Sequence, residues 1–207
     1  MRAALPVAGA AALACGLAAL VAAPPAGPPP SGPAVVDVLV VPPVGSAAVA
    51  TGFEYGEGRI VTVAHLPPAR RARVLVRSDV GPAQRARIVA VDRRGDLAVL
   101  ALGAATPRSS PLPGFDSARL LVRRDGRPAA LPVEIRRRIN ARIRPRPGAA
   151  PVLRPALELE ARVRQGDSGA PLVGGDGHLL GVLFAQSSGP SDTAYAVAAE
   201  RLEALAR

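Results

Sequence analysis

Short runs of apolar and β-branched residues, separated by turns rich in Gly, Pro and Asp, recur along most of the chain. Runs of this length between turn residues are typical of β-strands. We expect strands at residues 59–63, 73–77, 87–91, 97–102, 118–123, 133–139, 157–163, 171–173, 179–185 and 194–197. One helix is expected at 198–207, where Leu202 and Leu205 share a face. The pattern therefore predicts an all-β chain that ends in a helix, folded as one domain or as two small fused barrels.

The N-terminal segment determines the expected compartment. Residues 3–23 carry no charge, consist mostly of Ala, Leu and Val, and follow Arg2. This composition predicts a hydrophobic helix, and we assign residues 1–23 to a signal peptide or a single membrane anchor. The Pro-rich residues 24–33 predict an extended spacer, so we place a linker and entry segment at 24–46. The domain at 47–207 is then expected outside the cytoplasm, either secreted or held at the membrane.

Residues 165–171 read Gln-Gly-Asp-Ser-Gly-Ala-Pro and predict a tight loop that presents a nucleophile. Gly166 allows the backbone to turn so that its own N–H and that of Ser168 point into one concavity. Two such donors can hold the negative oxygen of a tetrahedral acyl intermediate. Because a serine hydroxyl is a weak nucleophile by itself, this reading requires a base and an orienting acid elsewhere in the chain.

Two histidines are the candidates for the base. His65 ends an apolar run, a position that would fix it at the end of a buried strand, whereas His178 lies in a Gly-rich turn. Asp96 immediately precedes another apolar run and is the candidate acid, because a shielded carboxylate orients an imidazole and stabilises its charged form. The order His65, Asp96, Ser168 differs from the Ser, acid, His order of the α/β-hydrolases.

Three motifs resemble those of the trypsin-like (chymotrypsin-fold) serine proteases of the compact bacterial type. They are Thr62-Val63-Ala64-His65, Asp96-Leu97-Ala98-Val99-Leu100 and Gly166-Asp167-Ser168-Gly169-Ala170-Pro171. The chain is also similar to the small membrane-anchored extracytoplasmic proteases of actinobacteria. The resemblance implies two six-stranded-type antiparallel β-barrels, at about 47–105 and 114–200, joined by a crossing at 106–113. It implies no metal and no organic cofactor.

The resemblance also indicates a substrate pocket. Its position implies that Arg162, Phe184, Ala185 and Gln186 line the pocket for the side chain before the cleaved bond. An inward Arg162 would favour acidic side chains there, and an outward one would leave a small apolar pocket. Asp167 pairs in many family members with an N-terminus freed by cleavage. No activation site is evident ahead of the domain, so we expect another donor, such as an arginine, to hold Asp167.

The basic charge of the chain suggests a further contact. All 26 basic residues are arginines, and with 16 acidic residues they give a net charge of +10. Residues 136–138 together with Arg142, Arg144 and Arg146 form a basic patch that could contact anionic lipids or envelope polymers. General use of Arg in place of Lys explains the same composition. Nucleic-acid binding is not expected, because the chain has three Phe, two Tyr and no recognised binding motif.

We therefore expect a serine endopeptidase that cleaves protein or peptide substrates through a His-Asp-Ser triad and an acyl-enzyme. The alternatives are a latent protease or a pseudoprotease-like binding module of the cell envelope.

Overall fold

The computed structural model describes residues 32–56, 58–66, 72–103, 112, 114, 116–144, 148, 150–187 and 192–206. The expected hydrophobic helix at 1–23, the start of the spacer and most of the crossing at 106–113 lie outside these residues. Within the described ranges, no helix combines the length and the apolar character needed to cross a bilayer.

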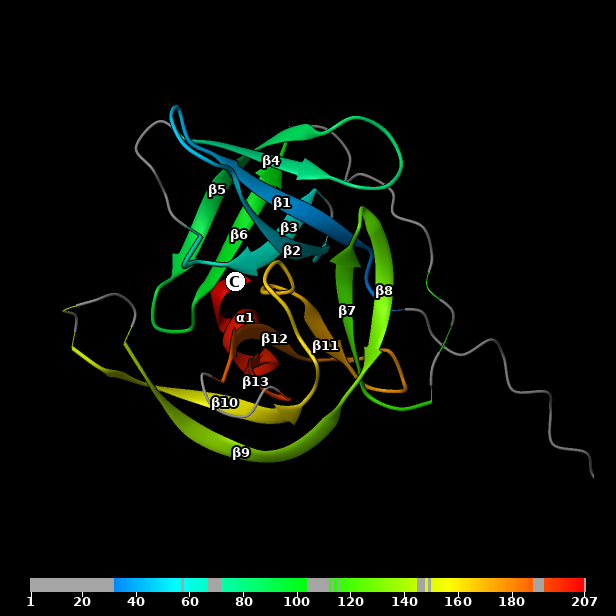
Figure 1. The fold of residues 1–207 in the computed structure, drawn as a ribbon, viewed down its shortest axis with the longest axis vertical. Coiled ribbons are helices and arrows are strands. Elements are labelled where there is room, and N and C mark those ends of the chain that lie inside the picture. Colours follow the sequence, from blue (N-terminus) through cyan, green and yellow to red (C-terminus); the bar gives the residue numbers. More distant parts are fainter. Residues whose placement is uncertain are drawn as a thin grey trace, which may run out of the picture.

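The N-terminal half is a closed antiparallel barrel with the strand order β1-β2-β3-β6-β5-β4 (Figure 1). Its strands are β1 (Val35–Val41), β2 (Ala48–Glu54), β3 (Arg59–Val63), β4 (Arg73–Arg77), β5 (Gln84–Asp92) and β6 (Leu97–Leu102). The first of the two expected six-stranded barrels is thus confirmed, and β3, β4 and β6 have the predicted bounds.

Strand β1 corrects the predicted boundary at residue 47. It lies within the segment 24–46 that was assigned to a linker and entry, yet it pairs with both β2 and β4 and so closes the barrel. Its sequence is almost continuously apolar, and five of its seven residues are buried, including the first four. The barrel interior needs this strand, because without it the inner faces of β2 and β4 would meet water.

The C-terminal half is a seven-stranded antiparallel sheet with the order β8-β7-β11-β12-β13-β10-β9. Its strands are β7 (Arg119–Arg124), β8 (Arg127–Pro132), β9 (Glu134–Ile143), β10 (Val152–Glu160), β11 (Pro171–Val173), β12 (Leu179–Gln186) and β13 (Thr193–Ala198). This sheet corresponds to the second expected barrel, and its two edge strands, β8 and β9, are one run of chain interrupted only at Val133, which pairs with β7 at one end and with β10 at the other.

Strand β8, which was not predicted, begins at a hairpin. Asp125 and Gly126 both have positive φ, at 54° and 76°, and they turn β7 back into β8. This geometry matches the twist of antiparallel strands and suits an Asp-Gly pair. Only Val133 separates β8 from β9, and these two strands occupy opposite edges of the sheet, so the chain bends there after Pro132.

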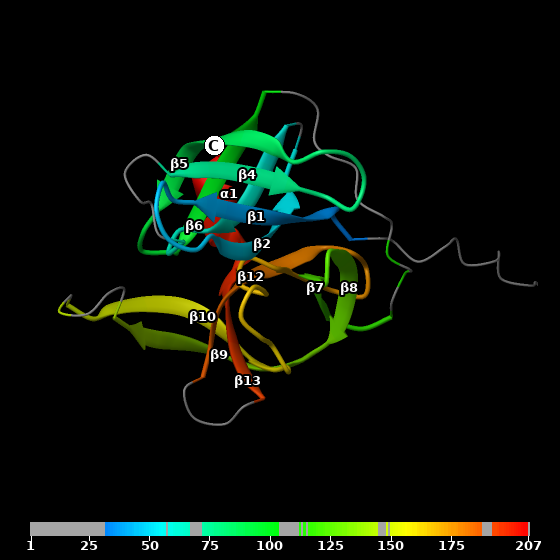
Figure 2. The same cartoon turned by 45° about the horizontal axis from the view of Figure 1, so that its top comes forward.

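One apolar cluster spans the two halves, in addition to a cluster within each half. Figure 2 shows the barrel stacked on the sheet, with β2 facing β7 and β12. A single cluster of buried side chains includes Val35 and Phe53 from the barrel and Leu121 and Val182 from the sheet. Helix α1 (Ala199–Ala206) follows β13 and adds Leu202, which is fully buried, to the same cluster. Burial of this apolar surface holds the halves together and fixes the loops that meet between them.

Candidate active site

His65 and Asp96 are brought together by the pairing of β3 with β6. Val63 is the partner of Leu97 in that ladder, and the next residue along, Ala64, donates its N–H to the Asp96 carbonyl at 3.0 Å. The chain then places His65 Nδ1 2.7 Å from Asp96 Oδ2. The imidazole is 45% exposed and the carboxylate 10% exposed, so the base can reach a substrate while its acid partner is shielded from water.

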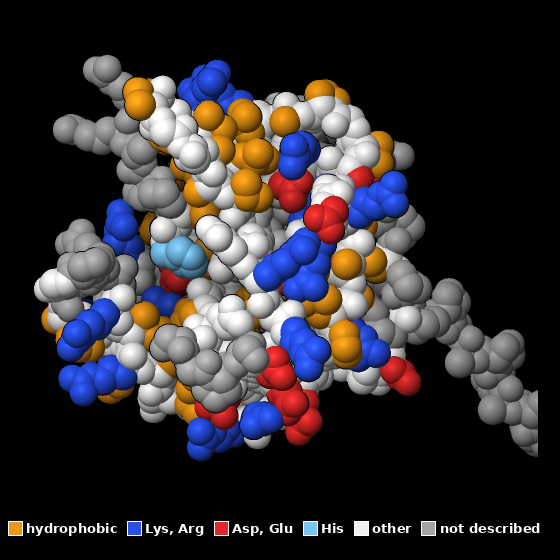
Figure 3. Space-filling view, viewed as in Figure 1, with side chains coloured by type: hydrophobic (Ala, Val, Ile, Leu, Met, Phe, Trp, Pro, Cys, Tyr) orange, Lys and Arg blue, Asp and Glu red, His pale blue; other side chains and the backbone are white. Residues whose placement is uncertain are grey.

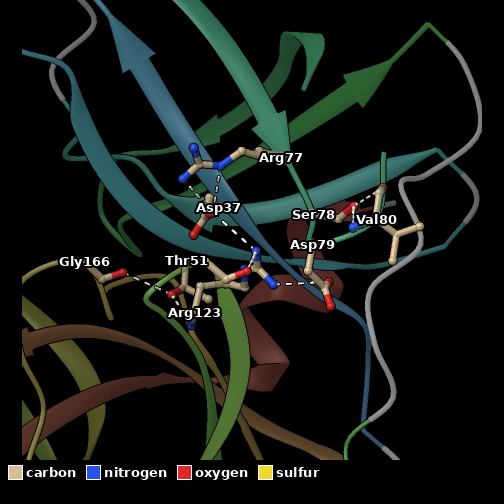
Figure 4. Close-up of polar contacts among 9 residues, drawn as sticks. Asp37, Thr51, Arg77, Ser78, Asp79, Val80, Arg123 and Gly166 are labelled. Atoms are coloured by element: carbon tan, nitrogen blue, oxygen red, sulfur yellow. Dashed lines mark hydrogen bonds and ion pairs between the residues drawn. The ribbon is translucent and has the colours of Figure 1, made fainter. Parts of the chain in front are cut away.

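The loop that carries Ser168 is bound to the barrel through Thr51. The Thr51 N–H donates to the Ser168 carbonyl at 2.9 Å. The Thr51 hydroxyl donates to the Gly166 carbonyl at 3.0 Å, as Figure 4 shows. The Thr51 carbonyl in turn accepts a 2.8 Å hydrogen bond from the hydroxyl of Thr62, on the strand that leads to His65. Among the described residues, Ser168 and His65 share no side-chain hydrogen bond.

Two glycines allow this loop its shape. Gly166 and Gly169 have φ of +97° and +90°. A Cβ on Gly169 would lie 2.0 Å from the Thr51 carbonyl oxygen, so the loop can approach β2 only with glycine there. The N–H groups of Asp167, Gly169 and Ala170 donate to backbone carbonyls, whereas those of Gly166 and Ser168 have no backbone acceptor among the described residues.

Asp167, within this loop, is buried and only 1% exposed. Arg124 Nη2 donates to its Oδ2 at 2.6 Å and Arg124 Nε to its Oδ1 at 3.3 Å. The backbone N–H of Arg164 adds a third donor at 2.8 Å. Arg124 is therefore the arginine that was expected to hold this carboxylate, and it comes from β7.

Sequence reasoning missed the arginine beside it. The Arg123 side chain is almost fully buried and reaches Asp79 at 3.3 Å, Asp37 at 3.4 Å and the Gly126 carbonyl at 2.6 Å (Figure 4). Its backbone N–H donates to the Thr51 hydroxyl at 3.2 Å. Arg123 thereby ties the sheet to the barrel next to the Ser168 loop.

A second buried arginine, Arg154, approaches Asp96 from the sheet. Its Nη1 lies 3.5 Å from Asp96 Oδ2, the oxygen that contacts His65. Burial lowers the pKa of the Arg154 guanidinium, and the nearby Asp96 and Asp92 carboxylates act against that effect. The sequence signal that could have revealed it is a charged residue at an inward-facing position of a strand.

The predicted pocket residues separate into two groups. Phe184 is buried and stacks with Tyr195 at a centroid distance of 6.5 Å, and Ala185 and Gln186 follow it on β12. The side chain of Arg162, in contrast, is 89% exposed and pairs with Asp192 at 3.5 Å. Arg162 therefore points outward, the arrangement expected to leave a small apolar pocket.

The basic patch is partly neutralised by acidic partners. Arg136 pairs with Glu160, Arg137 with Glu158 and Arg138 with Glu200. Hydrogen bonding to Glu160 raises the pKa of the Arg136 guanidinium, and hydrogen bonding to Glu158 raises that of Arg137. Figure 3 shows blue and red side chains interspersed on the lower half of this face, while apolar side chains gather over the barrel above. Contact with an anionic surface thus stays a prediction.

Comparison with known proteins points to one family. The model of the trypsin-like peptidase domain matches residues 50–182, which is more than half of the 207 residues. No curated protein sequence matches the chain.

Solved structures give the same indication. The active form of the Rv3671c protease from M. tuberculosis is 27% identical, with a TM-score of 0.70 over 84% of this chain and 80% of that one. The inactive form of the Rv3671c protease has a TM-score of 0.66 at 27% identity, over 84% of this chain and 88% of that one. Deg5 is 20% identical, with a TM-score of 0.63 over 84% of this chain and 87% of that one, and it shares the fold.

Proposed function

The chain belongs to the trypsin-like peptidase domain family and is a serine-type peptidase, and on this premise we propose that it is an endopeptidase with Ser168, His65 and Asp96 as its triad. The observation that carries the assignment is the 2.7 Å contact between His65 Nδ1 and Asp96 Oδ2, together with the attachment of the Ser168 loop to the same barrel through Thr51. Protein or peptide chains are the proposed substrates.

The first half of the reaction forms an acyl-enzyme. Neutral His65 takes the proton of the Ser168 hydroxyl as its oxygen attacks the peptide carbonyl carbon. The carbonyl electron pair moves to oxygen, and the resulting oxyanion is held by the N–H groups of Gly166 and Ser168. Asp96 stabilises the charged imidazole. When the oxyanion collapses, the bond to the amine breaks and His65 gives its proton to the leaving nitrogen.

The second half returns the enzyme to its starting state. Water takes the place of the amine, and His65 removes its proton as the water oxygen attacks the ester carbon. Collapse of this second oxyanion breaks the ester bond, and the proton on His65 returns to the Ser168 oxygen. The peptide acid leaves, and no other reactant is consumed.

The support for a preformed oxyanion loop comes from the contacts of Asp167. Its buried carboxylate is already paired with Arg124 and with the Arg164 N–H, and these contacts favour an active protease over a latent one. The outward direction of Arg162 supports a small apolar side chain before the cleaved bond. The uncharged residues 3–23 support an extracytoplasmic location, secreted or anchored.

Replacement of Ser168 by Ala tests the proposal. We expect kcat for a peptide substrate to fall by about 10⁴-fold or more and covalent labelling by a fluorophosphonate to disappear, because the nucleophile is gone. Ser117→Ala, at an exposed serine of a surface turn, is the matched control and should label like the wild type. A folded Ser168→Ala protein that retains full activity would refute the triad.

The same probe separates the alternatives. Rapid labelling of the wild-type protein indicates a formed site. A folded wild-type protein that takes up no label indicates a latent protease or a pseudoprotease-like binding module.

A further inference from the structure

Arg154 occupies an inward-facing position that a strand usually gives to an apolar residue. On β10, Arg154 and Ala156 are buried while Leu153 and Pro155 are exposed, as expected for alternating faces of a sheet. The Arg154 side chain is 3% exposed. A buried cation costs free energy unless it is paired, so its partners show what the position is used for.

These partners lie on the other half of the molecule. Arg154 Nε donates to the Arg94 carbonyl at 2.7 Å, and Nη1 lies 3.5 Å from Asp96 Oδ2. Both acceptors belong to the turn that joins β5 to β6 of the barrel, whereas Arg154 belongs to the sheet. The guanidinium thus holds two points of one turn from across the interface between the halves.

The aromatic ring of Phe184 packs against the Arg154 guanidinium. The Arg154 Cζ atom lies 4.5 Å from the centroid of the Phe184 ring, within the range of a cation–π contact. Because Phe184 is itself buried on β12, it restricts the directions in which the guanidinium can turn. Two hydrogen-bond acceptors and one ring therefore define the place of the Arg154 side chain.

Asp96 needs such support for a local reason. Its φ is +61°, a left-handed conformation that costs a non-glycine residue free energy, although Asp adopts it more readily than most. The same oxygen, Oδ2, faces both His65 and Arg154. A carboxylate held by one donor can rotate about its side-chain bonds, and a second donor on the same oxygen limits that rotation.

We propose that Arg154 is a positioning residue that holds the Asp96 carboxylate, and through it the His65 imidazole, in the geometry needed for catalysis. The inference rests on the proposed function, because it gives Asp96 and His65 their roles. It assigns to the sheet half of the molecule a part in orienting the acid and base that the barrel supplies.

Two substitutions at Arg154 test the inference. Arg154→Met keeps the length of the side chain and removes the donors and the charge. Arg154→Lys keeps the charge, but a single ammonium cannot reproduce the two-armed contact with Arg94 and Asp96. Arg85→Met, at an exposed position of β5, is the matched control. Melting temperature, kcat, KM and the downfield N–H resonance of His65 are measured for each protein.

We expect Arg154→Met to lower kcat by about 10- to 100-fold with KM within about twofold, since misplaced catalytic groups slow the chemical step. The downfield His65 resonance should broaden or vanish in the same protein. Arg154→Lys should lie between this variant and the wild type. A folded Arg154→Met protein with wild-type kcat and an unchanged resonance would overturn the inference. If Arg154→Met does not fold, an Arg154→Lys protein with the kcat and the His65 resonance of the wild type would overturn the inference.

The resonance also separates this inference from the proposed function. It reports the His65–Asp96 hydrogen bond whether or not the protein cleaves peptides, and a His178→Gln protein, which retains the signal, assigns it to His65. A wild-type protein without turnover counts against the proposed function. A resonance that is identical with and without Arg154 counts against the positioning role alone.

Discussion

Arg124 and Asp167 form a two-armed ion pair that joins β7 to the loop ahead of Ser168, with Nη2–Oδ2 and Nε–Oδ1 distances of 2.6 and 3.3 Å. Asp167 lies almost completely out of water, while Arg124 remains partly exposed. The loop is therefore supported by a side chain of the folded domain itself.

Replacement of Arg124 by Met should loosen this loop. The buried Asp167 carboxylate would lose its charged partner, at a cost of about 3 kcal/mol in the free energy of unfolding. We expect fluorophosphonate labelling to slow by about 10- to 100-fold, because Gly166 and Ser168, the proposed oxyanion donors, flank Asp167. Labelling rate and thermal unfolding measure the two effects. Arg127→Met, at an exposed position of β8, should change neither, and an Arg124→Met enzyme that labels at the wild-type rate would contradict the prediction.

The two histidines should differ sharply in their contribution to activity. His65→Gln should lower kcat by about 10⁴-fold or more, because the proposed acceptor of the Ser168 proton is lost. His178→Gln should leave kcat unchanged, since His178 lies in the turn between β11 and β12, where its backbone N–H donates a hydrogen bond to Asp176 Oδ1. Steady-state peptide hydrolysis compares the two proteins. Similar losses in both variants would show that His65 has no special role.

Gly169 and Gly166 provide a matched pair for stability. A Cβ at Gly166 would meet open space, so Gly166→Ala should lower the free energy of unfolding only through the strain of its positive φ, by about 1–2 kcal/mol. Alanine at Gly169 adds a contact at 2.0 Å with the Thr51 carbonyl oxygen, which belongs to the backbone and cannot move aside. We expect Gly169→Ala to lower the free energy of unfolding by more than about 3 kcal/mol, or to prevent folding. Equal denaturation midpoints for the two variants would show that the loop does not rest on β2.

Asp92 gives the fold an acid-sensitive contact. Arg201, on helix α1, donates a hydrogen bond from Nη2 to Asp92 Oδ1 at 3.1 Å. Hydrogen bonding to Arg201 lowers the pKa of the Asp92 carboxyl below its ordinary value of 3.8. A carboxyl with a lowered pKa stabilises the folded state fully above its unfolded-state pKa, and this stabilisation is lost as pH falls through the folded-state pKa. Wild type should therefore exceed Asp92→Asn in melting temperature at pH 6, and the difference should shrink below about pH 4. A difference that is constant from pH 6 to pH 3 would contradict this assignment.

Local sequence patterns were sufficient for most of the strands. β3, β4, β6 and β11 have the predicted bounds, because apolar runs between turn residues specify them without reference to the rest of the fold. β8 was missed although Asp125-Gly126 is a hairpin signal, since the strand itself is only half-buried and contains two Pro residues. β1 was missed because its apolar run follows directly on the Pro-rich segment, and β2 (Ala48–Glu54) was not predicted either.

The candidate site was predictable only where its residues belong to short motifs. His65, Asp96 and Ser168 each stand within such a motif, and the contact of His65 with Asp96 follows from the register of β3 and β6. Arg123 and Arg154 were not predictable in this way. Their carboxylate partners Asp37 and Asp96 lie 86 and 58 residues away in the sequence, and only the docking of the two halves brings them together.

Thr51 shows what this docking implies for folding. This buried residue of β2 donates hydrogen bonds to the carbonyls of Gly166 and Ser168 and accepts one from the backbone N–H of Arg123. All three partners belong to the other half. If either half unfolds, these three bonds are lost together with the shared apolar core. We therefore expect the barrel and the sheet to unfold as a single cooperative unit, so that partial unfolding of either half also disrupts the active site.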